Sequence, residues 1–261
     1  MVLAFLIAPA KHPGASIAAP GLAVWPRRLV AMFSRAGLLL ALAVLFATGP
    51  AAAHSFKEVE SSLREREIYF EPRQQRPAPA FELQDAQGRS VHLADFRDKI
   101  VILHFVYASC PDACPLHAER IAEVQAMVNS TSMTELVQFV TITTDPVRDT
   151  PEVLRGYGPA HGLDAANWVF LTSGSNNPTA TRELAEKYGL RFTETPDGAQ
   201  MHAAVTHVID KNGDLRARFH GLEFSTTNMV VYINALLNEH DEHEHPQQRS
   251  LWQKLWSLFR P

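Results

Sequence analysis

The chain has 261 residues, of which 46% are hydrophobic and 20% charged, and a formal net charge of −4 at pH 7. This acidic balance argues against a nucleic-acid partner, because a protein that binds a polyanion normally presents an excess of positive charge. The length suits one domain with irregular ends, and no internal repeat is visible in the sequence.

The first 53 residues are predicted to be a signal peptide. An apolar run at residues 36–47 follows a basic residue and precedes Ala51-Ala52-Ala53, which is a small-residue cleavage pattern. The run is shorter than the roughly 20 apolar residues of a transmembrane helix, although an uncleaved membrane anchor is the alternative. We therefore expect an exported, periplasmic protein.

Two further features concern this leader. Met32 lies directly before its basic start, so residues 1–31 are expected to be an extension upstream of the true start. The leader contains four basic residues and no acidic ones, and residues 54–261 therefore carry a formal charge of −8.

An exported compartment is oxidising, so two free cysteines would form a disulfide there unless a reductant or a metal holds them.

The remaining chain is predicted to hold one α/β domain at residues 80–238. Residues 54–79 are charged and contain three prolines, which indicates an extended lead into that domain. Apolar runs, caps and turn residues then predict, in chain order, a hairpin at 81–83 and 90–93, a strand at 99–107, a helix from 116, a strand at 136–143, a helix capped by Thr150, a strand at 168–171, a helix at 179–188, a hairpin at 204–209 and 215–219, and a helix at 228–237. Strands that alternate with helices and end in a hairpin predict a mixed central sheet flanked by helices.

Cys110 and Cys114 are the only cysteines of the chain and are the predicted site of chemistry. They lie in Cys-Pro-Asp-Ala-Cys-Pro, between an apolar strand and a helix. Both sulfurs are thus expected near a helix N-terminus, where free backbone N–H groups and the helix dipole favour thiolate over thiol. A disulfide across this spacing would close so short a loop that it would stabilise the fold by only about 2 kcal/mol. The spacing therefore favours a redox or metal site over a structural crosslink.

Three stretches together resemble the Sco/SenC family. They are the cysteine motif, a histidine shortly before Asp-x-x-Gly, and the run Asp145-Pro146-Val147-Arg148-Asp149-Thr150-Pro151-Glu152. The resemblance covers residues 79–237. It implies a thioredoxin-like fold, here with an added N-terminal hairpin, and copper bound by two cysteines and one histidine. It also implies a role in loading the binuclear copper centre of cytochrome c oxidase.

Carried over residue by residue, the resemblance makes Cys110, Cys114 and His202 the copper ligands. His207 is the competing nitrogen ligand, but its place inside an apolar strand favours packing in the sheet. Asp145 is expected close to the cysteine loop. There it either orients a ligand without binding the metal itself or caps the turn that follows it.

The ligand types agree with copper on chemical grounds. Soft thiolates select Cu(I), and an added imidazole also supports Cu(II), so one site can hold either state and pass the ion on. Transfer to a copper-bearing subunit of cytochrome c oxidase, or to another copper protein, would proceed by exchange of ligands. No substrate bond changes in such a transfer, so we expect a copper chaperone rather than an enzyme in the strict sense.

Thiol–disulfide exchange is the rival interpretation. A peroxiredoxin would carry Thr where this chain has Tyr107, and a thioredoxin-like reductase would place a proline where it has His202. Two neighbouring cysteines of low pKa can nevertheless exchange disulfides with a client protein and with a thiol reductant. A disulfide reductase therefore stays open as the alternative.

Two more histidines lie in the predicted strand and helix on either side of the cysteines. His104 alternates within an apolar strand and is expected to be a buried core residue. His117, one turn after Cys114, could approach the site, but it is expected to face solvent.

Residues 239–261 are predicted to form a tail of two parts. The first is a mixed run of acidic residues and histidines that contains His240, His243 and His245. It either binds copper weakly or is simply solvated. The second, at 249–260, places tryptophan, leucine and phenylalanine on one helical face beside basic residues. It resembles an interfacial helix that would hold the protein at a membrane surface, or else a helix docked on the protein itself.

Overall fold

The computed structural model describes residues 55–194 and 200–239. The predicted signal peptide, the acidic and histidine run with His240, His243 and His245, and the amphipathic segment at 249–260 lie outside these residues. Within the described ranges, no helix has the length and apolar character needed to cross a membrane.

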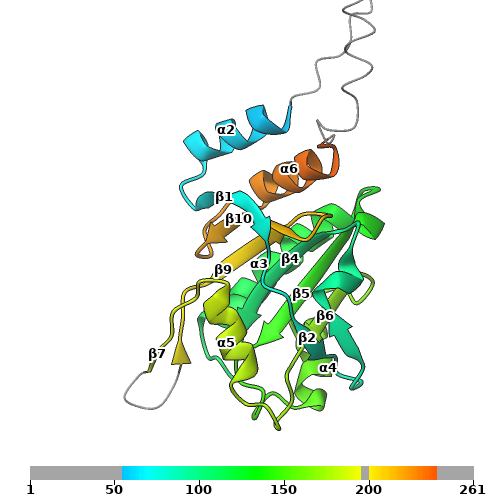
Figure 1. The fold of residues 1–261 in the computed structure, drawn as a ribbon, viewed down its shortest axis with the longest axis vertical. Helices are drawn as coiled ribbons and strands as arrows, with labels where there is room; N and C mark the ends of the chain where they lie inside the picture. The colour runs from blue at the N-terminus through cyan, green and yellow to red at the C-terminus, as the bar shows by residue number, and fades with distance from the viewer. Residues whose placement is uncertain (1–54, 195–199, 240–261) are drawn as a thin grey trace, which may run out of the picture. The chain divides into compact units, whose positions relative to one another are not determined.

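A six-stranded mixed sheet forms the centre of the described domain (Figure 1). In spatial order its strands are β1 (Phe70–Pro77), β10 (Asp214–His220), β9 (Val205–Ile209), β4 (Ile100–Val106), β5 (Val137–Thr143) and β6 (Trp168–Leu171). Strands β4, β5 and β6 run parallel, whereas β9, β10 and β1 continue the sheet through antiparallel pairs. All seven residues of β4 are buried, as is typical of a central strand covered on both faces. The predicted α/β class and mixed sheet are confirmed.

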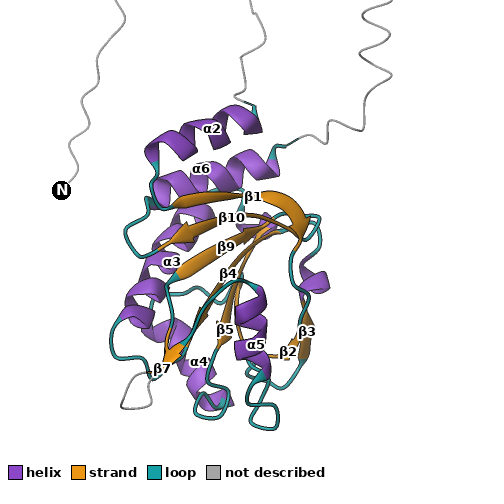
Figure 2. Cartoon of the chain, turned by 60° about the vertical axis from the view of Figure 1, so that its left-hand side comes forward, coloured by secondary structure: helices purple, strands orange, loops and turns teal. Residues whose placement is uncertain are grey.

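Helices cover both faces of this sheet (Figure 2). One face packs on α2 (Phe56–Arg66), α3 (Ala113–Asn129), α4 (Pro151–Ala160) and α6 (Thr226–Leu237). The opposite face packs on α5 (Ala180–Lys187) and on the predicted hairpin of β2 (Glu82–Gln84) and β3 (Ser90–His92), with a 3₁₀ turn at Leu93–Phe96. Each face therefore buries an apolar cluster of its own.

Local sequence signals explain where several helices begin. The hydroxyl of Thr150 accepts a hydrogen bond from the backbone N–H of Val153 at 3.5 Å, and Pro151 occupies the first helical position of α4, as predicted. Ser225 caps α6 in the same way. Helix α3 begins at Ala113, earlier than predicted, so its first turn includes one of the two cysteines.

The prediction of an extended lead at residues 54–79 is wrong for its first half. Residues 56–66 form α2, which begins with a reciprocal capping box between Ser55 and Glu58. Its apolar residues Phe56, Val59 and Leu63 share one face, but only Leu63 is fully buried, and the helix is supported by its packing on α6. Strand β1 is extended, as expected, but it pairs with β10 as the edge of the sheet, a position that tolerates proline.

Gly158 lets α4 approach β6 closely. An ideal Cβ at this position would lie 2.5 Å from Cη2 of the Trp168 ring and closer still to Cζ3. The indole is held in place, because its Nε1 donates a hydrogen bond to the Thr141 hydroxyl at 2.9 Å. A side chain at position 158 would therefore displace either the indole or the helix.

We expect Gly158→Ala to lower the free energy of unfolding by about 1–3 kcal/mol, the usual effect of overpacking. Gly156→Ala on the same helix is the matched control, since no atom lies within 4 Å of its ideal Cβ. The control should stabilise the protein by up to about 1 kcal/mol through helix propensity. Urea titrations followed by circular dichroism measure both changes, and an equal effect of the two variants would contradict the close packing.

Candidate metal centre

The cysteines lie at the carboxyl end of the central strand β4. The chain leaves this strand at Val106, turns through a hydrogen bond from the Cys110 N–H to the Tyr107 carbonyl at 3.1 Å, and enters α3 at Ala113. Cys110 is partly exposed in the turn, whereas Cys114 is buried in the first turn of the helix. This is the strand, loop and helix arrangement that the sequence predicts.

Both cysteines are free thiols that interact with each other. The backbone N–H of Cys114 donates to Sγ of Cys110 at 3.4 Å, and the two side chains are also hydrogen-bonded. The sulfurs are therefore assembled as a pair without a disulfide bond. Such a pair can bind one soft metal ion or close to an intramolecular disulfide.

The two thiols differ in acidity. Burial raises the pKa of Cys114 far above its ordinary value, and the hydrogen bond to Cys110 adds to this effect. Burial also acts to raise the pKa of Cys110, but it is outweighed by hydrogen bonds from the Cys114 thiol, from the N–H groups of Asp112 and Cys114, and from the Tyr107 hydroxyl. The pKa of Cys110 is therefore lowered. The expected lowering of the thiol pKa therefore holds for Cys110 alone, because the helix N-terminus does not offset the desolvation of Cys114.

Asp149 fixes the start of the cysteine loop, a role that sequence reasoning missed. Its carboxylate is 2% exposed and accepts hydrogen bonds from the Ala108 N–H at 2.9 Å and from the Thr143 hydroxyl. Burial raises the pKa of this carboxyl group, although the hydrogen bond from Thr143 opposes the shift. The contact ties the loop after β4 to the end of β5. In the sequence Asp149 indicates only a helix start, and its partner Ala108 lies 41 residues away.

Asp145 holds the turn between β5 and α4. Its carboxylate accepts a hydrogen bond from the Arg148 backbone N–H at 3.3 Å and pairs with the Arg148 guanidinium. Its carbonyl accepts a hydrogen bond from the Asp149 N–H at 3.0 Å. These contacts fit the alternative in which Asp145 caps the turn, and its orientation of a copper ligand stays a prediction.

His202 lies between a short hairpin and strand β9. The hairpin pairs β7 (Thr193–Glu194) with β8 (Gln200–Met201) and was not expected from the sequence. Nδ1 of His202 is 3.0 Å from the Ala203 carbonyl, while its buried Nε2 has no hydrogen-bond partner among the described residues. Burial lowers the pKa of His202, so the imidazole is neutral at pH 7. A metal-binding histidine commonly donates its other nitrogen to a backbone carbonyl in this way.

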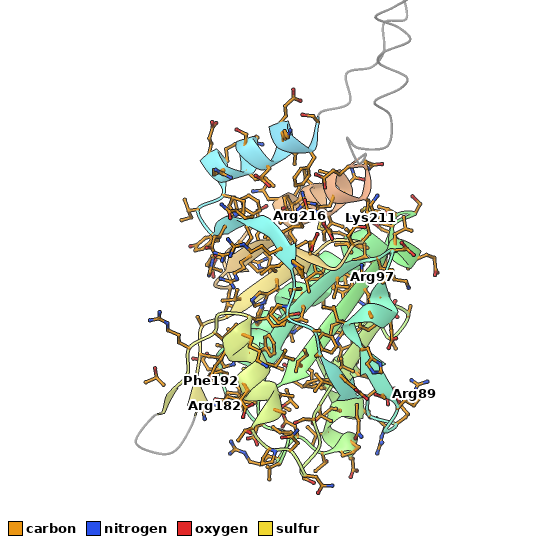
Figure 3. All side chains as sticks on the ribbon, in the orientation of Figure 1. Arg89, Arg97, Arg182, Phe192, Lys211 and Arg216 are labelled. Carbon is orange, nitrogen blue, oxygen red and sulfur yellow. The ribbon has the colours of Figure 1, made fainter. Side chains whose placement is uncertain are left out.

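Phe192 supports the ring of His202. The two ring centroids are 5.2 Å apart. On the phenyl ring in turn lies the guanidinium of Arg182 from α5, with its carbon 4.8 Å from the ring centre (Figure 3). The imidazole therefore packs, through Phe192, against a side chain of α5.

The three expected ligands do not form one coordination group. Among residues 55–194 and 200–239, no three His, Cys, Asp or Glu side chains are arranged to hold a metal ion. Burial and the nearby imidazole of His202 lower the pKa of His117 to about 3. His202 therefore lies within electrostatic reach of the helix turn that follows Cys114.

His117 is buried and does not face solvent, so that prediction is wrong. It is 1% exposed, its Nε2 lies 2.8 Å from the Thr206 hydroxyl, and its ring centroid is 4.8 Å from that of His104. Residues three apart on a helix share a face, so His117 follows Cys114 toward the sheet. His104 is a core residue, as predicted, and His207 is buried within the sheet, also as predicted.

We expect Cys110 to be alkylated by iodoacetamide at lower pH than Cys114. Its lowered pKa provides thiolate below the value of about 8.5 that is usual for a free cysteine. The variants Cys114→Ser and Cys110→Ser each retain one thiol and one hydroxyl donor, and mass spectrometry gives the two rates as a function of pH. In the folded protein Cys114 should react slowly, and it should react fully after denaturation. Faster alkylation of Cys114 in the folded protein would contradict the assigned acidities.

Comparisons with known proteins agree with this architecture. A family model described as SCO1/SenC matches residues 71–238. A SCO2-like protein from Rickettsia typhi is 27% identical over 160 residues, which cover 59% of this chain and 74% of the relative.

Two solved structures show the same fold. Yeast Sco1 with copper bound has a TM-score of 0.54 and 23% identity, and the match covers 70% of this chain and 99% of the yeast chain. BsSco belongs to the Sco family of cytochrome c oxidase assembly proteins, and a disulfide switch has been identified in it. It has a TM-score of 0.55 and 18% identity, and covers 64% of this chain and 96% of its own. The predicted thioredoxin-like fold is confirmed, and the chain belongs to the SCO1/SenC family.

Proposed function

We propose that this protein binds copper through Cys110, Cys114 and His202 and delivers it to a copper-bearing subunit of cytochrome c oxidase or to another copper protein. The observation that carries the proposal is the buried Nε2 of His202, which has no hydrogen-bond partner in the described part of the chain. A buried imidazole nitrogen without a partner costs stability unless it serves a ligand. Copper bound to yeast Sco1 supports the choice of metal.

The proposed ligands suit both common states of the ion. Two sulfurs favour Cu(I), and the addition of an imidazole accommodates Cu(II). Loading releases the proton of Cys114, because the metal binds the thiolate and this buried thiol is otherwise protonated. Copper binding should therefore weaken as the pH falls.

Copper loading requires His202 to approach the sulfurs. The cysteine loop is anchored by Asp149 through the Ala108 N–H, whereas His202 is held by ring contacts with Phe192. We infer that the histidine moves and the sulfurs stay in place. Its contact with the Ala203 carbonyl keeps Nε2 as the nitrogen that is free to bind.

Delivery then proceeds by exchange of ligands. A cysteine or histidine of the client joins the copper, and the donor ligands leave in turn. Cys110 is partly exposed and Cys114 is buried, so the client reaches the copper on the side of Cys110. No substrate bond is broken, and the protein acts as a carrier.

Thiol–disulfide exchange is the second candidate, and the unequal acidity of the cysteines favours it. The Cys110 thiolate would attack a client disulfide, forming a mixed disulfide and releasing one client thiol. Cys114 would then lose its proton and displace the second client sulfur, which leaves a Cys110–Cys114 disulfide and a reduced client. A thiol reductant would have to restore the pair. The disulfide switch of BsSco is consistent with such chemistry.

We also propose where the protein acts. Residues 32–53 would direct export to the periplasm, and residues 249–260 would hold the protein at a membrane surface. His240, His243 and His245 would add weak copper sites in the tail. Fractionation of cells that express the full chain or a chain ending at residue 246 tests the location: an equal membrane-bound share of both would remove the anchoring role.

We expect the reduced protein to bind one copper ion per chain. Cys110→Ser, Cys114→Ser and His202→Ala should each weaken binding by more than the 10–100-fold that is typical of losing a residue that only supports a ligand. His202→Ala should also remove the imidazole nitrogen signal from the electron paramagnetic resonance spectrum of the Cu(II) form. Competition with a chelator of known affinity measures the losses.

His92→Ala is the matched control for this series. His92 is a partly exposed histidine whose nitrogens lie 3.5 Å from Glu82 and 3.4 Å from Asp95, and copper affinity should not change on its removal. If His202→Ala kept the copper affinity and the electron paramagnetic resonance spectrum of the unaltered protein, His202 would not be a copper ligand. A reduced protein that binds no copper but reduces a client disulfide would leave the reductase as the function.

A further inference from the structure

A basic pocket lies at the edge of the sheet formed by β1 and β10, apart from the cysteine loop. Its volume is about 440 Å³, and β1, the end of α5 and β10 line it. Four of its lining residues are cations, namely Arg73, Arg76, Lys187 and Arg218. This cluster is unexpected in a chain whose residues 54–261 carry a net charge of −8.

The positive charge of the pocket is largely uncompensated. Arg73 pairs with Glu71 at 2.7 Å, whereas Arg76 donates to the neutral amide of Gln74 at 3.1 Å. Lys187 is exposed and has no ion-pair partner in the part of the chain that the structure describes. Glu71 also lies 3.8 Å from Arg218, so one carboxylate is shared by two of the four cations.

Arg218 is the fixed element of the pocket. Its Nη2 donates to the Tyr188 carbonyl, and an ideal Cβ on Gly189 would lie only 2.8 Å from the same nitrogen, so the backbone is packed against the guanidinium. Its Nε is buried and has no hydrogen-bond partner among the described residues, and Nη1 lies 3.8 Å from Glu71. Burial and repulsion by Arg73 lower the pKa of Arg218. A nearby anion would relieve both the unmade hydrogen bond and the repulsion.

We propose that this pocket binds an acidic segment of a partner protein. Carboxylates match guanidinium groups in charge and in the geometry of paired hydrogen bonds. The pocket is polar and lies on an edge strand that bulges between Pro72 and Arg76. Pockets for small molecules are mostly apolar and enclosed, so an extended segment lying along the edge fits better.

The pocket leaves the cysteine loop accessible. Strands β1 and β10 form one edge of the sheet, whereas the loop follows the central strand β4, and no residue of the loop lines the pocket. A partner held at the edge would therefore not cover Cys110. The proposal does not depend on copper binding and can be tested in its absence.

A fluorescent peptide of alternating Glu and Gly is the probe, and the matching Gln and Gly peptide is its control. Fluorescence anisotropy at low and moderate salt should show that only the acidic peptide binds. Arg218→Gln should weaken that binding by at least about tenfold, as expected for one charge-assisted hydrogen bond. The double variant Arg76→Gln with Lys187→Gln should have a comparable effect, and because both residues are exposed it keeps the test valid if Arg218→Gln does not fold.

The matched control removes two exposed cations from elsewhere, by Arg64→Gln with Arg155→Gln. It should change binding by less than about twofold, the effect of charges outside the contact. If the control and the pocket variants lost peptide affinity equally, the pocket would not be the binding site. If citrate bound more tightly than the acidic peptide, the pocket would be a site for a small polyanion, and the proposal of a protein partner would be wrong. Much tighter peptide binding after deletion of residues 240–261 would show that the chain's own acidic tail is the occupant and would likewise overturn it.

Discussion

The buried carboxylate of Asp149 is the constraint on which the site depends. It accepts hydrogen bonds from the Ala108 N–H and the Thr143 hydroxyl, and so it joins the loop after β4 to the end of β5 in the interior of the domain. The loop leads directly into α3, which carries Cys114. The position of the cysteine loop therefore follows from a contact between the segments that succeed β4 and β5, and not from the cysteine motif alone.

Burial then makes the two thiols differ in acidity. Cys110 lies in the turn, where hydrogen bonds stabilise its thiolate, and Cys114 lies one helical turn deeper, where desolvation keeps its proton. The imidazole of His202 packs separately against Phe192, and its buried Nε2 has no hydrogen-bond partner among residues 55–194 and 200–239. In the function that we propose, the anchored sulfur pair stays in place while the histidine from another segment moves to join it.

The domain thus presents two chemically different regions. The carboxyl end of β4 carries two cysteine thiols, whereas the β1–β10 edge carries guanidinium groups in an otherwise acidic chain. Both regions have a buried nitrogen without a hydrogen-bond partner in the described residues, His202 Nε2 in one and Arg218 Nε in the other. Membership of the SCO1/SenC family accounts for the first region. The second region is a property of the particular residues on β1, α5 and β10.

The sequence by itself determined the α/β class, most of the strands, the cap of α4 and the place of the cysteines between a strand and a helix, because periodicity, caps and turns act over a few residues. His202 was identified as a candidate copper ligand only through a family resemblance. Tertiary structure alone decided the pairing of β1, the anchoring of Ala108 by Asp149, the burial of His117 against Thr206, and the gathering of four cations at one edge. Each of these joins residues far apart in the chain, for example 41 positions for Ala108 and Asp149 and 89 for His117 and Thr206. Contacts of that range leave no local pattern, so folding had to bring their partners together before their roles could be seen.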